Sequence, residues 1–444
     1  MTDSPKAPGL VRSLKLWHLI LFGIIIIQPT APMGIYGVVS NIAGGHVVTT
    51  ILIAMVAMLF TAVSYGRMAR VYPQAGSAYS YVSGELHPKL GYVVGWAMLM
   101  DYILNPIICV IWCSQAARNV LPGVPFAFWA IAFALTFTFL NTRGIQASSR
   151  VNAILTLVMT VVVVLFLGDG VRYILHTLHP TGAALLLPFY DPATFHVSSL
   201  FRGTSVAVLT YIGFDGISTM AEEVENPRRN ILLATVLTCL VIGMLSAVEV
   251  YTAQLAWPSH QPFPENIVDT AFVHIALRIG GPYLFQLLNA TLLIANMGSG
   301  IAAQFGASRL LYSMGRSGSL PSFFGAVDER HHVPRNNVLL VGAAALAGAF
   351  LLTYEQGAEL LNFGAFIAFI GVNAAALVHY RFRSKDRVLL PALIPGLGIL
   401  ICVFIWLHLN HGAQLLGAAW LAIGLAVAWA MRRSRRLGQV RTRA

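Results

Sequence analysis

The feature that most constrains this chain is a succession of long apolar runs with few charges between them. A helix that crosses a bilayer needs about 20 predominantly apolar residues, and the sequence holds twelve such runs. Hydrophobic residues make up 57% of the 444 residues and charged residues 10%, whereas about 25% of a soluble domain is charged. We therefore expect an all-α integral membrane protein with twelve transmembrane helices. The runs centre near Ile27, Val56, Met100, Leu135, Val161, Leu209, Ile242, Leu293, Ala345, Ile367, Ile401 and Ala422.

The basic residues are distributed asymmetrically between the runs. If the N-terminus is cytoplasmic, most of the 28 Lys and Arg fall in cytoplasmic segments, and the exceptions are Arg118, Arg172, Arg202 and Arg278. This is the positive-inside pattern, so we expect a multi-pass protein of the inner (plasma) membrane with both termini in the cytoplasm. The net charge of +11 then reflects membrane orientation, not nucleic-acid binding. We interpret the basic tail as an anchor at an anionic leaflet.

Two of the runs are interrupted. The first, "IIIIQPTAPMGIYGVVS", holds two prolines and two glycines, and in the sixth Gly213 and Gly216 flank Asp215. Proline inside a helix removes a backbone hydrogen bond, and in lipid the freed polar group is tolerated only where it faces protein or a wet cavity. Five helices separate the two breaks. This placement is typical of an inverted-repeat transporter with discontinuous helices.

Four motifs follow one another along the chain. They are "YPQAGSAYSYVSGELHPKLGYVVGW" at 72–96, "GFDGISTMAEEVENPRRNI" at 213–231, "SRLLYSMGRSGSLP" at 308–321 and "LLNFGAFIAFIGVNAAAL" at 360–377. In this order they resemble the amino acid–polyamine–organocation (APC) permeases over nearly the whole chain. The resemblance implies a LeuT-like 5+5 inverted repeat with broken helices 1 and 6, followed by two C-terminal helices.

The resemblance also divides the chain into segments. The polar N-terminus shows no cleavage site before the first run, which favours a retained helix over a signal peptide. No polar connection is long enough to build a soluble core. The expected segments are a cytoplasmic N-terminus (1–15), the first repeat (16–170), an external loop (171–197), the second repeat (198–380), two further helices (381–431) and the basic cytoplasmic tail (432–444).

The first break is similar to that of putrescine-importer-like members of the family. Many amino acid permeases carry a Gly-Ser-Gly or Gly-Thr-Gly turn there, whose backbone N–H groups hold the substrate carboxylate at a half-helix N-terminus. The matching triplet here is Pro32-Met33-Gly34. Proline has no N–H, so one donor is missing, while Met33, Gly34 and Ile35 keep theirs. This departure favours a substrate whose amine contributes more of the binding.

The substrate amine needs a counter-ion, and Asp215 is the natural candidate. An intramembrane carboxylate costs at least about 2.5 to 3.5 kcal/mol and is a functional candidate by default, although an Asp beside Gly also serves as a helix cap. Asp101, in "GWAMLMDYILNP", either binds substrate, relays a proton or is held by a neighbouring polar group. Tyr211 and Phe214, with Gly213 between them, either close over the substrate or simply pack.

Other polar residues in the runs have more ordinary interpretations. Glu249 lies late in the seventh run, where we expect it to snorkel to the interface. Asn296, Ser299 and Asn362 either line a cavity or make interhelical hydrogen bonds. The four cysteines also lie in apolar runs, and we expect them to behave as small buried hydrophobic residues. They are Cys109, Cys113, Cys239 and Cys402.

The sequence leaves the coupling mode open. In several proton-linked relatives a Lys of the fifth helix contacts the broken first helix, and the matching position here is Met159. A proton on Asp101 or Asp215, sodium at unwound carbonyls and ion-free exchange are the remaining routes. We assign no catalytic residue, metal ligand or cofactor, and the sequence does not define an oligomeric state.

The function predicted from these features is secondary transport. We expect a small amine or polyamine of the putrescine type, or an amino acid, to be imported by alternating access. Two alternatives stay open: a neutral or cationic amino acid permease of the same fold, and a transporter-like ligand sensor, which would bind ligand without counterflow. A channel is disfavoured because the two breaks suit an occluded midplane site better than a continuous pore.

Overall fold

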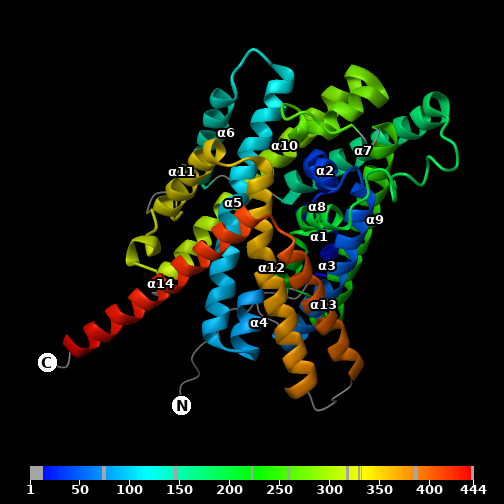
Figure 1. The fold of residues 1–444 in the computed structure, drawn as a ribbon. Helices are drawn as coiled ribbons and strands as arrows, with labels where there is room; N and C mark the ends of the chain where they lie inside the picture. The colour runs from blue at the N-terminus through cyan, green and yellow to red at the C-terminus, as the bar shows by residue number, and fades with distance from the viewer. Residues whose placement is uncertain are drawn as a thin grey trace.

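The computed structural model is a bundle of helices (Figure 1). It describes residues 14–72, 77–144, 149–221, 224–257, 261–316, 320–328, 331, 333–383 and 389–441. Most of the predicted N-terminal segment, part of three of the four motifs and the end of the basic tail therefore lie outside the described residues. Within those ranges the sole β pairing is a bridge between Leu14 and Val224.

The first half of the chain forms seven α-helices within the described ranges. They are α1 (Leu16–Ile27), α2 (Ala31–Ile42), α3 (Val47–Val71), α4 (Ser77–Glu85), α5 (Pro88–Val120), α6 (Phe126–Thr142) and α7 (Ser149–Tyr173), the last continued by the π-helix η1 (Ile174–Leu178). The short helix α4 lies between the membrane helices α3 and α5, where the sequence has its Ala-Gly-Ser motif.

The second half begins with a helix that breaks into short pieces. These are α8 (Val197–Ala207) and the 3-10 helices η2 (Val208–Tyr211) and η3 (Phe214–Met220). The elements that follow are α9 (Pro227–Ala256), η4 (Val268–Thr270), α10 (Ala271–Arg316), η5 (Ser322–Gly325), α11 (Arg335–Leu351), α12 (Tyr354–Val378), η6 (His379–Arg383), α13 (Leu389–Leu407) and α14 (His411–Arg441). Within α10 the backbone turns at Gly281, directly before Pro282.

Every predicted apolar run falls on an apolar helix. Among the described residues, eight spans are long and apolar enough to cross a membrane, and the pair α1 and α2, bent by 46°, makes a ninth. The remaining three runs correspond to the shorter apolar helices α6, α11 and α13. The chain is therefore a multi-pass membrane protein.

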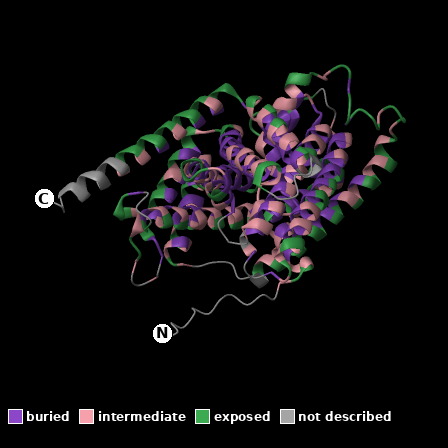
Figure 2. Ribbon diagram, turned by 90° about the horizontal axis from the view of Figure 1, so that it is seen from below, coloured by how far each residue is buried: buried purple, intermediate pink, exposed green. Residues whose placement is uncertain are grey.

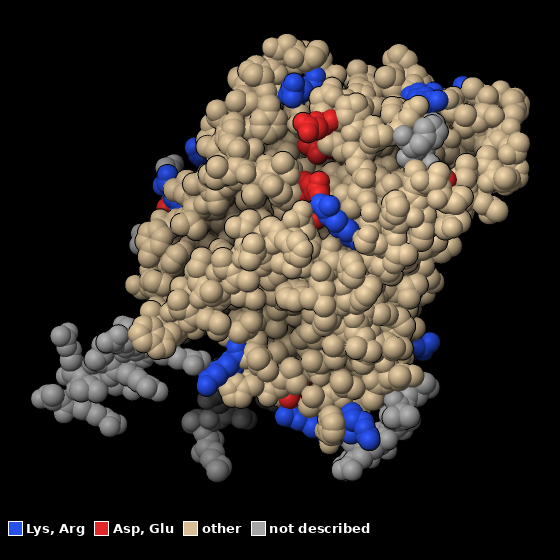
Figure 3. All heavy atoms as spheres, viewed as in Figure 1, with Lys and Arg blue, Asp and Glu red and all other residues tan. Residues whose placement is uncertain are grey.

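Long central helices build the core. α5 packs against α10 and α12, and α3 packs against α9, so that buried residues gather inside the bundle and exposed ones outside (Figure 2). α14 extends away from the bundle (Figure 1). In Figure 3 a broad band of uncharged side chains crosses the face, with Lys and Arg along its lower edge. This arrangement is that of a protein whose middle faces lipid.

Candidate functional site

The two breaks predicted from the sequence lie against each other. α1 packs on η3, and α2 packs on α8 and η2. The approach is close, because a Cβ added at Gly213 would lie 2.6 Å from Cγ2 of Ile26, and one added at Gly216 would lie 3.1 Å from Cδ1 of the same residue. Interrupted backbone from both halves of the chain thus meets at one place inside the bundle.

The first break covers residues 28–30. Gln28 has a positive φ of 73°, and its side-chain amide donates to the carbonyl of Ala295 on α10 at 3.4 Å. The Thr30 hydroxyl lies 3.9 Å from the sulfur of Met159 on α7. Met159, where the resemblance to the family implied a Lys in several proton-linked members, therefore touches the break with a thioether.

The Pro32-Met33-Gly34 triplet is helical, since α2 begins at Ala31. The N–H of Ala31 donates to the carbonyl of Gln28 at 3.2 Å, and that of Met33 donates to Thr30 at 3.1 Å. Pro32 contributes no donor. The first turn of α2, which would otherwise be an anion site, therefore has three of its four donors engaged or missing, the exception being the N–H of Gly34. Met33 and Ile35 are buried.

Gly34 faces two aromatic side chains. A Cβ added there would lie 3.4 Å from the Tyr354 hydroxyl of α12 and 3.8 Å from Nε1 of Trp112 on α5. The Trp112 indole is fully buried, and its N–H has no hydrogen-bond partner among the described residues. Trp112 and Tyr354 were not among the predicted site residues, because an aromatic residue in an apolar run ordinarily indicates packing.

The second break lies at Ile212 and Gly213. Gly213 has a φ of 119°, a region that favours glycine because a side chain is strained there. The Tyr211 hydroxyl donates to the carbonyl of Ile51 on α3 at 2.8 Å. Phe214 packs between the rings of Tyr65 and Phe369, with both ring centroids 5.5 Å away. Both aromatic residues flanking the break are buried.

The two predicted carboxylates come together beside this break. Asp101 on α5 lies within electrostatic range of Asp215 on η3, and Tyr65, Tyr81 and Tyr102 lie within the same range of Asp215. The hydroxyl groups of Tyr65 and Tyr81 have no hydrogen-bond partner among the described residues. Each Asp keeps part of its surface accessible. Neither forms an ion pair with a described basic side chain.

Backbone N–H groups of Gly213 and Gly216 also face the Asp215 carboxylate. The N-cap position of η3 is Gly213, with no side-chain capping hydrogen bond, so a capping role for Asp215 stays a prediction. Neutral backbone donors would in any case supply no positive charge. Two like charges near each other in a low dielectric repel, and a bound cation or a proton on one of them relieves that repulsion.

Among the other polar candidates, Asn362 has a clear structural role. Its amide donates to the carbonyls of Ser205 at 2.7 Å and Val206 at 3.2 Å, where α8 is about to break. Asn296 bonds back to its own helix at Leu292, and Ser299 donates to Asn105 at 3.4 Å. The four cysteines are buried and free, as predicted for small hydrophobic residues.

The prediction for Glu249 was wrong. Its side chain does not snorkel to the interface: it is 0% exposed, and neither carboxylate oxygen has a hydrogen-bond partner among the described residues. The reason is that α9 continues to Ala256, about two turns beyond Glu249. Its position on the helix also turns the side chain inward.

The acidic residues near the helix ends are paired. Glu85 of α4 is 2% exposed and lies 2.7 Å from Nδ1 of His379 and 3.1 Å from Nη1 of Arg383. The Tyr72 hydroxyl donates to it at 3.0 Å. This cluster ties α4 to the end of α12.

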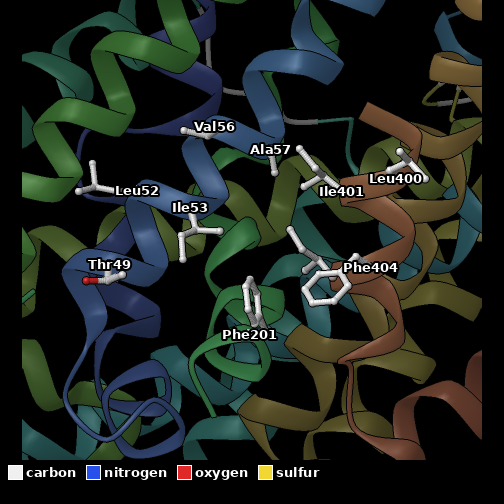
Figure 4. A pocket seen from close by; sticks show the side chains of 10 residues that line it. Thr49, Leu52, Ile53, Val56, Ala57, Phe201, Leu400, Ile401 and Phe404 are labelled. Carbon is white, nitrogen blue, oxygen red and sulfur yellow. The ribbon is translucent and has the colours of Figure 1, made fainter. Parts of the chain in front are cut away.

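An apolar groove opens outward between α3, α8 and α13 (Figure 4). Its lining includes Leu52, Val56, Phe201 and Phe404 but no charged side chain. A charged or zwitterionic solute would lose its hydration there without compensation. The groove is therefore a poor candidate for the solute site, and the paired breaks with their two carboxylates are the better one.

The arrangement of broken helices around intramembrane carboxylates is that of a membrane permease, and the comparison with known families agrees. Residues 18–424 match the amino acid permease family. The chain belongs to this family, which confirms the resemblance identified from the four motifs.

Curated relatives cover nearly the same length. The low-affinity putrescine importer PlaP of Escherichia coli (strain K12) is 32% identical over 434 residues, covering 96% of this chain and 94% of the relative. The branched-chain amino acid permease BcaP of Bacillus subtilis (strain 168) is 25% identical over 448 residues, covering 94% of this chain and 92% of the relative. The mitochondrial cationic amino acid transporter 3 of Arabidopsis thaliana is 27% identical over 408 residues, covering 86% of this chain and 64% of the relative.

Proposed function

We propose that the chain is a secondary active transporter that imports a small diamine of the putrescine type by alternating access. The observation that supports this most strongly is the pair Asp101 and Asp215, two partly accessible carboxylates beside the breaks that lack an ion pair with any described basic residue. A diamine carries two ammonium groups, so it would neutralise both.

The proposed architecture has twelve transmembrane helices in a LeuT-like 5+5 repeat. The first repeat would be residues 16–170 and the second 198–380, with the shorter apolar helices α6, α11 and α13 as membrane helices too. The contacts of α1 with η3 and of α2 with α8 suit two interrupted helices that run antiparallel through the middle of the bundle. Both termini would be cytoplasmic, in the inner membrane.

The roles of the site residues follow from their chemistry. Asp215 would hold one ammonium group through a charge-assisted hydrogen bond, and Asp101 the other. Phe214, Tyr211 and Gly213 would shape the second break around the methylene chain, and the first turn of α2, Pro32 to Ile35, would form the opposite wall. Because Pro32 has no N–H and those of Ala31 and Met33 are engaged, a carboxylate would find fewer donors there than at an ordinary helix N-terminus.

A second candidate is an amino acid permease of the same fold. It is favoured by the likeness to BcaP and to the cationic amino acid transporter, and by the buried Trp112 N–H, which faces Gly34 without a described partner. That N–H could donate a hydrogen bond to a substrate carboxylate oxygen. A sensor with a transporter's architecture would bind the same ligands but would not exchange them across a membrane.

A competition panel separates these functions. Proteoliposomes that contain the purified protein are loaded with unlabelled putrescine. Counterflow of labelled putrescine is then measured in the presence of external putrescine, arginine, alanine or γ-aminobutyrate as competitor. We expect counterflow that putrescine inhibits most strongly. Stronger inhibition by alanine or arginine would favour the amino acid permease. Saturable binding without any counterflow would indicate a sensor.

A further inference from the structure

Glu249 is a buried acid that the proposed substrate site does not use. It lies within α9, and its side chain has no accessible surface. Both of its carboxylate oxygens are without a hydrogen-bond partner among the described residues. An ionised carboxylate in such surroundings is far more costly than a neutral carboxylic acid. The site therefore favours a carboxyl group that carries its proton.

No neighbouring charge replaces that proton. α9 packs against α1, α2, α3, α7, α10, η1, η2 and η3, and Glu249 forms no hydrogen bond or ion pair with a described side chain on any of them. The titratable and charged side chains on those elements include His18, Tyr36, Tyr65, Arg67, Arg70, Asp169, Arg172, Tyr173, His176, Tyr211, Asp215, His274 and Arg278.

Two unsatisfied hydroxyl groups lie on the face of α9 that runs from Glu249 toward the second break. Ser246 and Thr238 share its face of α9, because about 3.6 residues make one turn. Both are buried, and their hydroxyl oxygens have no hydrogen-bond partner among the described residues. Further along α9, Cys239 lies close enough to Asp215 for the two to interact. Buried hydroxyl groups without partners are the positions at which ordered water completes hydrogen bonds.

We infer that Glu249 is a proton-binding site that couples a proton gradient to the transport proposed above. In the conformation described here, the carboxyl group is sealed and neutral. When α9 and the second break rearrange to open the cytoplasmic side, water reaches the group along the face of Ser246 and Thr238. The O–H bond then breaks, its electron pair stays on the carboxylate oxygen, and the proton passes to cytoplasmic water.

The return step takes a proton from the external side. The carboxylate regains a proton there before it is buried again, because burying the charged form is unfavourable. One proton therefore enters with each transport cycle. This role differs from the one proposed for Asp101 and Asp215, which would hold the amine and which keep part of their surface accessible.

The test uses Glu249→Gln in the full-length protein, because Gln matches the shape of the neutral acid and cannot release a proton. Labelled putrescine uptake into proteoliposomes is measured with the membrane potential clamped at zero, with and without a gradient of one pH unit, acidic outside. For one proton per cycle, wild type should accumulate about tenfold more with the gradient, since one pH unit corresponds to a factor of ten in proton activity. Glu249→Gln should show no stimulation but keep counterflow.

Glu359→Gln is the matched control. Glu359 is 1% exposed but lies 3.9 Å from Nε of Arg202, so its charge has a partner and it should keep the gradient stimulation. Retained stimulation in Glu249→Gln would overturn the inference. If that variant does not fold, proton flux with a pH-sensitive dye in wild type decides: putrescine-driven proton entry supports coupling, and counterflow without proton entry contradicts it. Absence of wild-type counterflow would instead contradict the proposed transport.

Discussion

Acidic side chains at the ends of the bundle and those in its interior have opposite surroundings. At the ends, Glu85 contacts His379 and Arg383, and Glu355 contacts Arg202 at 3.0 Å. In the interior, Asp101, Asp215 and Glu249 have no ion pair among the described residues. Among these five acids, those at the ends join elements through ion pairs, and those in the interior have no ion pair with a described residue.

The difference separates structural from functional charge. Removing one partner of a buried ion pair leaves an uncompensated charge and destabilises the fold. Removing an unpaired buried charge has no such penalty and relieves the cost of desolvating it. Neutralising an acid at the ends should therefore lower stability and leave ligand binding unchanged. Neutralising Asp101 or Asp215 should weaken ligand binding and leave stability unchanged or higher.

The largest expected effect is on binding by Asp215→Asn. Asn keeps the size and much of the capping ability of Asp but cannot pair with an ammonium group. Truncating one side of a buried charge pair costs about 2 to 5 kcal/mol, or roughly thirtyfold to several thousandfold in affinity. Equilibrium binding of labelled putrescine measures the loss. The melting temperature should be equal to or above that of wild type, and affinity within threefold of wild type would leave Asp215 as a cap only.

The next effect concerns the missing donor at Pro32. Pro32→Gly adds an N–H in the first turn of α2 and loosens its backbone. A charge-assisted hydrogen bond contributes about 1.5 to 3 kcal/mol, before the entropic cost of glycine, so affinity for γ-aminobutyrate should rise relative to putrescine. Competition binding with both ligands measures the ratio of the affinity for γ-aminobutyrate to the affinity for putrescine. A ratio equal to that of wild type would mean that this amide does not contribute to selectivity.

At the end of the bundle where α4 meets η6, Glu85→Gln should act on stability. It leaves Arg383 and His379 without their acid, and the loss of a hydrogen-bonded partner of a charged group costs on the order of 1 to 3 kcal/mol, reduced here because Arg383 is half exposed. We expect a lower melting temperature and unchanged putrescine affinity in detergent. An unchanged melting temperature together with weakened binding would reverse the contrast between the two groups of acids.

The smallest effect is expected at Asp328, outside the membrane helices. The ring of His331 at 2.9 Å and its backbone N–H at 3.0 Å hold the pKa of Asp328 below its usual value. A lowered pKa in the folded protein stabilises it at pH values above the usual range, and this contribution disappears as the pH falls through the lowered value. Asp328→Asn should slightly lower the melting temperature at neutral pH and leave transport unchanged. A difference that persists at acidic pH would point to another cause.

Much of the fold could be predicted from the sequence. Apolar runs predict helices whatever their partners, because the bilayer requires them, and both breaks lie in the predicted runs. The details of the first break differed: Pro32 was expected in the interruption, but proline is also favourable in the first turn of a helix, and α2 begins before it.

The site was harder to predict, because burial depends on which face of a helix meets its neighbours. Asp101 and Asp215 could be selected, since an acid in an apolar run is unusual. The inward direction of Glu249 depends on where α9 ends and on how it packs, which a single run does not reveal. Trp112 and Tyr354 were missed because their contacts with Gly34 join segments far apart in the chain.

The central claim is that Asp101 and Asp215 hold the two ends of one dication. The most direct measurement compares the affinities of wild type, Asp101→Asn and Asp215→Asn for putrescine and for butylamine, which has the same chain but one amine. Either variant should lower the ratio of putrescine to butylamine affinity by at least about tenfold, because each removes a partner that only a diamine uses in full. A ratio unchanged from wild type in both variants, with folding intact, would contradict the claim.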